Sequence, residues 1–165
     1  MIIFLEPHRT FLRKLVTGNV EFILVGGYAV NFYGYTRTTG DIDLWLKPDN
    51  DNRDRLVSVL TKEGFSEEGI NKIQSLDFTT MVAFHTGEIP FKVDFMTHIS
   101  GLTFSEAISK KESLIVDDVV IPVLHFDHLI ISKISTSRGR DKADAEELQK
   151  INALAKKETD HRHKK

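Results

Sequence analysis

The feature that most constrains this chain is a pair of carboxylates, Asp41 and Asp43, inside the strand-like stretch TRTTGDIDLWL. Successive side chains of a β-strand point to opposite faces, so residues two apart point the same way. Two like charges side by side on a half-buried strand are costly unless a positive charge lies between them. A divalent metal ion is the usual partner. Such a site would need a third ligand and a phosphate-binding element elsewhere in the sequence.

The composition fits one soluble globular domain. The chain has 165 residues, of which 41% are hydrophobic and 28% charged, enough for one core without a second domain. A net charge of -2 gives no general attraction to nucleic acid or to an anionic membrane. The absence of cysteine excludes disulfides, thiolate metal sites and a thiol nucleophile. The apolar run at residues 2–5 is too short for a signal sequence, and no later segment approaches a membrane span. We expect a cytoplasmic protein.

The hydrophobic periodicity predicts helices that alternate with short strands. We expect strands at 22–25, 41–46, 79–86, 91–96, 113–116 and 119–124. We expect helices at 8–17, 28–33, about 50–64 and 105–111, one from 126, and a last one to about 156. Residues 66–76 are mixed in character and predict a loop with room for one helical turn. The last helix is expected to turn these residues inward: Ala143, Leu148, Ile151 and Leu154.

This order of elements predicts an α+β (mixed α/β) fold, in which helices pack on a small mixed sheet. We expect a single domain over residues 1–165. Its core would span about 20–124, followed by C-terminal helices at about 125–156 and a basic tail at 157–165.

Two further features accompany the aspartate pair. Gly26 and Gly27 lie between a strand and a helix, where glycine lets a phosphate approach the backbone and the helix N-terminus favours its charge. Asp94 lies on a later strand, on the face opposite the aromatic residues, and we expect its apolar neighbours to bury it. A double glycine alone more often marks a plain tight turn. Three carboxylates beside a phosphate cradle, however, describe a two-metal phosphoryl or nucleotidyl transfer site.

This combination resembles the polymerase-β-type nucleotidyltransferase superfamily. The matching pattern is Val25-Gly26-Gly27, then Asp41-Ile42-Asp43-Leu44, then a strand that carries Asp94. The stretch GGYAVNFYGYTRTTGDIDL is similar to a small bacterial branch that includes abortive-infection nucleotidyltransferase toxins and lincosamide-type antibiotic nucleotidyltransferases. Residues 127–148 resemble the C-terminal helical segment of the toxin-like group, so the resemblance covers roughly 22–148.

The resemblance implies a metal site at the three carboxylates. Asp41 and Asp43 would ligate Mg²⁺ (or Mn²⁺), and Asp94 would complete the site or act as general base on the acceptor hydroxyl. The metal would lower the charge on the α-phosphate of the substrate NTP.

The resemblance also implies a nucleotide-binding role for five residues. Gly26 and Gly27 would hold the β- and γ-phosphates of the NTP. Lys133 would lie near the phosphates, and Arg37 and Thr39 could touch the triphosphate. Many members have serine where this chain has Gly27, so backbone N–H groups would replace the hydroxyl contact. A lysine on a helix is otherwise usually a solvated charge.

Other polar and aromatic clusters favour structural roles. Arg138, Arg140 and Lys142, with Asp141 and Asp144, fit a salt-bridged helix start somewhat better than a patch for an RNA acceptor. The histidines show no metal-ligand spacing. The aromatic residues near the double glycine could stack a base, but core packing is the favoured use; they are Tyr28, Phe32, Tyr33 and Tyr35.

We therefore expect a Mg²⁺-dependent enzyme that transfers an NMP from an NTP to an acceptor hydroxyl on RNA, a partner protein or a small molecule. The toxin-like segment favours RNA or protein, and a toxin–antitoxin component. The alternative is an inactive member of the fold that acts as a binding or regulatory partner, such as an antitoxin. A nucleic-acid-binding module without chemistry is disfavoured by the near-neutral charge. The sequence identifies neither the NTP nor the oligomeric state.

Overall fold

The strand that carries Asp41 and Asp43 lies inside a mixed β-sheet. The computed structural model describes residues 4–162 of the chain. In that part of the chain, six strands form one sheet in the order β3-β4-β2-β1-β6-β5. The strands are β1 (Phe22–Val25), β2 (Asp41–Leu46), β3 (Ala83–Thr86), β4 (Lys92–Met96), β5 (Glu112–Val116) and β6 (Val119–Val123).

The register of β2 with its two neighbours determines what surrounds Asp43. Strand β2 is antiparallel to β1, and Asp43 is opposite Val25, the residue before the double glycine. On its other side β2 is parallel to β4, and Asp43 is opposite Asp94. The sheet therefore brings the glycine turn and both other carboxylates to Asp43.

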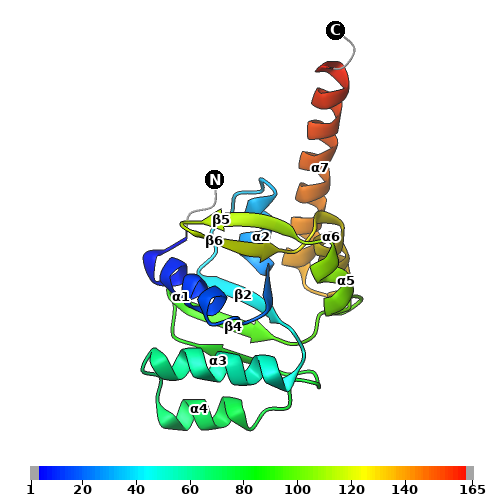
Figure 1. Ribbon diagram of the computed structural model, residues 1–165. Helices are drawn as coiled ribbons and strands as arrows, with labels where there is room; N and C mark the ends of the chain where they lie inside the picture. Colours follow the sequence, from blue (N-terminus) through cyan, green and yellow to red (C-terminus); the bar gives the residue numbers. More distant parts are fainter. Residues whose placement is uncertain (1–3, 163–165) are drawn as a thin grey trace.

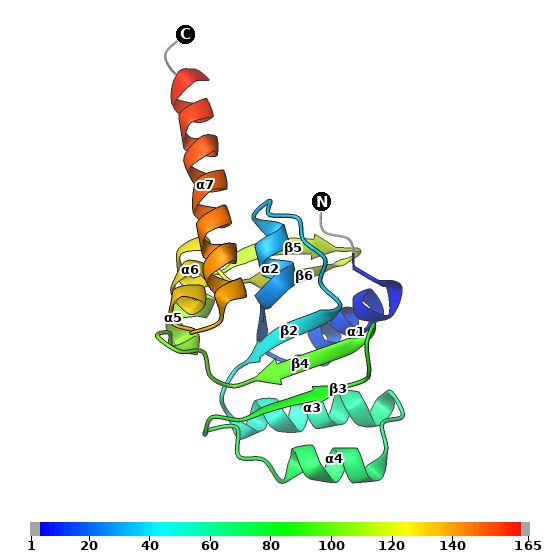
Figure 2. The ribbon, with the colours of Figure 1, turned by 180° about the vertical axis from the view of Figure 1, so that it is seen from behind.

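The helices form layers on the two faces of the sheet. They are α1 (Glu6–Thr17), α2 (Gly26–Phe32), α3 (Asn50–Lys62), α4 (Glu67–Gln74), α5 (Phe104–Ser109), α6 (Phe126–Ile134) and α7 (Gly139–Arg162). Helices α1 and α3 cover the face turned to the viewer in Figure 1, whereas α2, α6 and the start of α7 lie on the face seen in Figure 2. The C-terminal half of α7 projects away from the rest of the molecule (Figure 1).

Apolar side chains on both faces of the central strands form the core. All four residues of β1 are buried, as expected for a strand covered on both faces. Trp45 is fully buried; its indole N–H donates to the Thr97 carbonyl at 3.1 Å, and its ring meets Phe104 edge-to-face at 5.5 Å. Burial of a large side chain stabilises a fold by roughly 1.5–3 kcal/mol. Trp45 thus anchors α5 beside the face that carries Asp43.

The mixed α/β fold and most of the predicted elements are confirmed, but the loop predicted at 66–76 is wrong. Residues 67–74 form helix α4. Ser66 caps it by accepting a hydrogen bond from the Gly69 N–H at 3.2 Å, and Ile70 and Ile73 are buried one turn apart. Helix α4 packs against α3, so tertiary burial outweighs the low helix propensity of Gly69.

The strand predicted at 79–86 begins later, at Ala83. Asp77 accepts hydrogen bonds from the backbone N–H of Thr79 at 3.0 Å and from its hydroxyl at 2.7 Å. An aspartate that bonds the backbone two residues on makes a turn, which delays the strand. The hairpin of β3 with β4 is otherwise as predicted.

The last helix turns a different face inward than the sequence predicts. Leu148 is buried as expected, but Ala143 and Leu154 are exposed, and the buried residues of α7 are Asp141, Asp144, Ala145 and Leu148. Helix α7 also continues to Arg162, so residues 157–162 of the predicted tail are helical. Residues 163–165, the end of that tail, lie outside the described residues, as do residues 1–3, which include the start of the apolar run at 2–5. Among the described helices, none combines the length and apolar character needed to cross a membrane.

Candidate active site

The three predicted carboxylates converge on one face of the sheet. Asp41 and Asp43 lie two apart on β2, and Asp94 is the register partner of Asp43 on β4. One oxygen of each carboxylate lies within 4.8 Å of the others. The predicted burial of Asp94 is wrong, because 24% of its side chain is exposed. Its neighbours Val93 and Phe95 point into the core, and Asp94 points to the open face.

Asp43 is the carboxylate most affected by this convergence. Burial, then the negative charges of Asp41 and Asp94, raise the pKa of Asp43 to about 6. The ammonium of Lys133 and the backbone N–H of Gly27 act in the opposite direction. Burial and the neighbouring negative charges therefore both disfavour the ionised form of Asp43, and a bound cation would offset both effects.

Lys92 is a member of the site that the sequence analysis missed. Its Nζ lies 2.8 Å from the Oδ2 of Asp94, and in the register it is opposite Asp41. The hydrogen bond to Asp94, and after it the charges of the three carboxylates, raise the pKa of Lys92. The alternation that places Asp94 on the open face also places Lys92 there, so the signal was present in the sequence.

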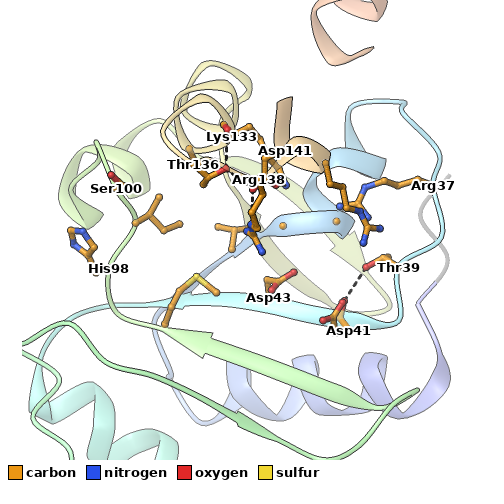
Figure 3. Close-up of a pocket in the computed structure, with 17 residues that line it drawn as sticks. Arg37, Thr39, Asp41, Asp43, His98, Ser100, Lys133, Thr136, Arg138 and Asp141 are labelled. Atoms are coloured by element: carbon orange, nitrogen blue, oxygen red, sulfur yellow. Dashed lines mark hydrogen bonds and ion pairs between the residues drawn. The ribbon is translucent and has the colours of Figure 1, made fainter. Parts of the chain in front are cut away.

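The other predicted residues meet in one cleft of about 350 Å³ (Figure 3). Those that line it are Gly26, Gly27, Arg37, Thr39, Asp41, Asp43 and Lys133. Within the described part of the chain, Asp94 is not one of the lining residues and lies beside the cleft, next to Asp43. Met96, the last residue of β4, and residues 98–100 beyond the strand line the cleft as well. Figure 3 shows His98 and Ser100 at the end away from Arg37.

The glycine turn leaves no room for side chains. Gly26 has φ +64°, and a Cβ added there would overlap the Oδ2 of Asp43. A Cβ at Gly27 would lie 2.6 Å from the Oγ1 of Thr39 and 2.9 Å from its Cβ. A serine at position 27 would therefore collide with Thr39, whose hydroxyl occupies that space. Thr39 also donates to the Asp41 carbonyl at 3.2 Å, which fixes its side chain beside the turn.

Arg37 is held over the same turn from two sides. The Asn31 side chain of α2 accepts from the Arg37 N–H at 3.1 Å and donates to the Arg37 carbonyl at 3.0 Å. The guanidinium Nη2 lies 3.2 Å from the Oδ2 of Asp144. The Nε of Arg37 is buried without a hydrogen-bond partner among the described residues.

The opposite wall of the cleft is an ion-pair network at the junction of α6 and α7. Lys133 lines the cleft, but only 9% of its side chain is exposed, because its Nζ lies 2.9 Å from Asp141 and 3.2 Å from Asp144. Asp141 also accepts from the Thr136 hydroxyl at 2.6 Å and pairs with the Nε of Arg138 at 2.8 Å. Burial opposes ionisation of Asp141, but these bonds, first that from Lys133, leave its pKa below the ordinary value.

Arg138 and Arg140 are less constrained than Lys133. Arg138 pairs with Asp141 through Nε, while 77% of its side chain is exposed, and it reaches into the cleft (Figure 3). Arg140 donates to the Thr38 carbonyl at 3.4 Å, so it spans the gap to the loop before β2. Both arginines line the cleft, whereas the structure does not place Lys142 there.

The aromatic residues near the turn serve in packing, as the sequence favoured. Tyr28 is buried and stacks on Phe4 at 4.6 Å. The Tyr33 hydroxyl donates to the Leu124 carbonyl at 2.7 Å. His125 accepts from the Asp127 N–H at 3.2 Å and so caps α6, which is a structural role.

A central mixed sheet with a carboxylate triad beside a strand–glycine–helix turn defines a nucleotidyltransferase-type protein. Residues 5–165 match the model of a family described as nucleotidyl transferase of unknown function (DUF2204). The chain belongs to this family. The expected membership of a nucleotidyltransferase family is thereby confirmed.

Several solved structures are similar to this chain, including the following two. The crystal structure of an antigenic nucleotidyltransferase-like protein from Paracoccidioides brasiliensis has a TM-score of 0.51 at 14% identity, over 89% of this chain and 74% of that chain. The solution structure of the antibiotic-resistance factor ANT(2'')-Ia has a TM-score of 0.47 at 12% identity, over 94% and 96%. The first likeness concerns the fold alone, and the second is too slight to support an argument. Comparison with curated proteins gave no match.

Proposed function

We propose that the protein transfers an NMP from an NTP to an acceptor hydroxyl, with a divalent metal ion, Mg²⁺ or Mn²⁺, held by Asp41, Asp43 and Asp94. The observation that carries the proposal is the convergence of three carboxylate oxygens within 4.8 Å of one another beside the glycine turn. A set of carboxylate oxygens suits a hard cation, and burial, together with the negative charges of Asp41 and Asp94, raises the pKa of Asp43. When bound, the metal supplies positive charge to the reacting phosphate oxygens.

The side chains divide the remaining tasks by their positions. Asp94, at the side of the cleft, accepts the proton of the acceptor hydroxyl, whose oxygen then attacks the α-phosphorus. The bond from the α-phosphorus to the bridging oxygen breaks, and pyrophosphate leaves with its electron pair. Lys92 bonds Asp94 at 2.8 Å and keeps the carboxylate oriented.

The triphosphate is bound by the opposite part of the cleft. Gly26 and Gly27 allow its oxygens to approach backbone N–H groups, and the Thr39 hydroxyl stands where a serine at position 27 would act. Arg37, Lys133 and Arg138 supply positive charge from two walls of the same cleft. These cations favour a polyanionic substrate despite the slightly negative net charge of the chain.

The acceptor lies on RNA, a partner protein or a small molecule. The similarity of residues 127–148 to the toxin-like group supports RNA or protein, and a toxin whose partner is an antitoxin. The cleft continues past the metal-binding carboxylates to His98 and Ser100, which leaves an exposed end for an acceptor (Figure 3).

The proposal is tested by incubating the protein with each α-³²P-labelled NTP, Mg²⁺, and RNA or a cell extract as the acceptor. We expect label transfer and pyrophosphate release that Asp41→Asn and Asp43→Asn abolish. Asp118→Asn is the matched control, because Asp118 is an exposed aspartate paired with Arg13 away from the cleft. If the wild type binds no Mg–NTP, the inactive binding-partner alternative replaces the proposal. If both site variants transfer label as well as the wild type, Asp41 and Asp43 do not hold the catalytic metal and the proposal is wrong.

A further inference from the structure

We infer that Asp141 and Asp144 are positioning residues, two buried carboxylates of α7 that aim Arg37, Lys133 and Arg138 at the triphosphate. The inference rests on the proposed function and deepens it. It assigns a role at that site to an ion-pair network for which the sequence alone favours a structural role.

The burial of both carboxylates requires an explanation. The side chain of Asp141 is 5% exposed and that of Asp144 is 2% exposed, one turn apart on the inner face of α7. Taking a carboxylate out of water is costly unless it is paired and hydrogen-bonded. A buried ion pair is often no more stabilising than apolar residues of the same volume. Aliphatic residues at positions 141 and 144 would therefore pack α7 on the molecule equally well, as Leu148 does one turn further on.

The partners of the two carboxylates are cations from three separate segments. Arg37 comes from the loop before β2, Lys133 from α6, and Arg138 from the connection between α6 and α7. Asp144 lies 3.2 Å from both Arg37 and Lys133, and Asp141 lies within 3 Å of both Lys133 and Arg138. The two carboxylates thus join three cations into one connected network.

All three cations line the cleft that also contains the glycine turn. Without the carboxylates, three like charges at this wall would repel one another and turn toward solvent. Lysine and arginine side chains lose much rotamer freedom when a ligand orders them. Asp141 and Asp144 order these side chains before the ligand arrives. The network still carries a net positive charge, since it has three cations and two carboxylates.

A purely structural network makes a different prediction. If Asp144 only joined α7 to the loop before β2, its loss would lower the melting temperature and leave the triphosphate affinity of the folded protein unchanged. A positioning role predicts weaker triphosphate binding below the melting temperature, and predicts that the loss passes through the two cations that Asp144 contacts, Arg37 and Lys133.

The test measures binding of Mg–ATP, Mg–GTP and inorganic triphosphate to the full chain by titration calorimetry, at a temperature where circular dichroism shows each variant folded. We expect Asp144→Asn and Asp141→Asn each to raise the Kd by about tenfold. Each variant leaves Lys133 one carboxylate, so either can serve if the other fails to fold. Asp144→Glu, which keeps the charge, should restore most of the affinity. Glu147→Gln is the control on the same helix; its partner is Lys150, outside the cleft.

A double-mutant cycle separates action through Arg37 from independent effects. Arg37→Met combined with Asp144→Asn should lose less affinity than the sum of the two single losses, because the part of the Asp144 effect that acts through Arg37 is already gone and only the part through Lys133 remains. Additive losses, or wild-type affinity in both folded aspartate variants, would overturn the inference while the proposed function stands. If the wild type itself binds no nucleotide or triphosphate, both the inference and the proposed function fail.

Discussion

At the scale of single residues, the buried charge of Asp43 makes the site a source of instability when no cation is bound there. Its pKa in the folded protein, about 6, lies above the ordinary value of 3.8. A carboxyl group with a raised pKa favours the fold when protonated. Its contribution is therefore fully present below about pH 4 and is lost as the pH rises through 6. At neutral pH the metal-free protein keeps an unfavourable charge in its site.

Asp43→Asn should therefore raise the melting temperature of the metal-free protein at pH 7.5, by about 2–4 °C. The gain should shrink as the pH falls through 6 and vanish near pH 4, where Asp43 itself is protonated. Added Mg²⁺ should raise the melting temperature of the wild type but not of the variant. Thermal melts from pH 4 to 8, with and without Mg²⁺, measure both effects. A gain that does not change with pH would show that relief of charge is not its cause.

Gly26 is required by the position of Asp43 as much as by its own backbone. Gly26→Ala should lower Mg²⁺ affinity at least tenfold, because the new Cβ would displace the Asp43 carboxylate. Gly64→Ala is a matched control, since Gly64 also has positive φ, +80°, but has open space around its Cβ. Both variants carry the backbone penalty of roughly 1–2 kcal/mol, which melts would register. Mg²⁺ titration should distinguish them; equal Mg²⁺ affinities would refute the steric argument.

At the scale of elements, the sequence predicts those parts of the fold that local patterns determine. The strand at 22–25, the glycine turn and the two hairpins follow from alternation and turn residues, and the structure has them. The triad of carboxylates follows from the same alternation. Lys92 was missed although the pattern places it beside Asp94, because a lysine on a strand is ordinarily a solvated residue.

Contacts between segments that are distant in the sequence could not be predicted from it. The inner face of α7 was predicted from apolar spacing, but Asp144 is turned inward by Arg37 and Lys133. Neither partner can be recognised from the local pattern around Asp144. Helix α4 was missed for a related reason. Its packing against α3 stabilises it, and this contact cannot be recognised from the segment itself.

The cap of α4 offers a test of that account. Ser66→Ala should destabilise the protein by about 1 kcal/mol, because the Gly69 N–H loses its acceptor, and should lower the melting temperature by about 2–4 °C. Ser66→Asp keeps an acceptor at the helix start and should be close to the wild type. Mg²⁺ and NTP binding should remain unchanged in both, since α4 lies away from the cleft. A Ser66→Ala protein as stable as the wild type would mean that burial alone holds the helix.

At the scale of the whole molecule, the candidate site joins segments from both halves of the chain. The turn after β1 and the strands β2 and β4 supply the glycines and carboxylates, and α6 and α7 supply the opposite wall. Helix α7 thus has two parts with different tasks. Its first turns carry Asp141, Asp144 and Leu148 into the body of the protein, and residues 153–162 are exposed along their whole length.

Removal of residues 153–165 should therefore leave the fold and the cleft intact. We expect a melting temperature within about 2 °C of the full chain, because surface changes away from buried contacts are usually small. Mg²⁺ and NTP should bind with unchanged affinity.

A truncation after Arg138 is the contrasting variant. It also removes Asp141, Asp144 and Leu148, leaves Lys133 buried without its carboxylates, and should not fold stably. If the shorter deletion binds NTP normally but no longer labels the acceptor, the projecting part of α7 contacts the acceptor. If it loses NTP binding, the separation of α7 into two parts is wrong.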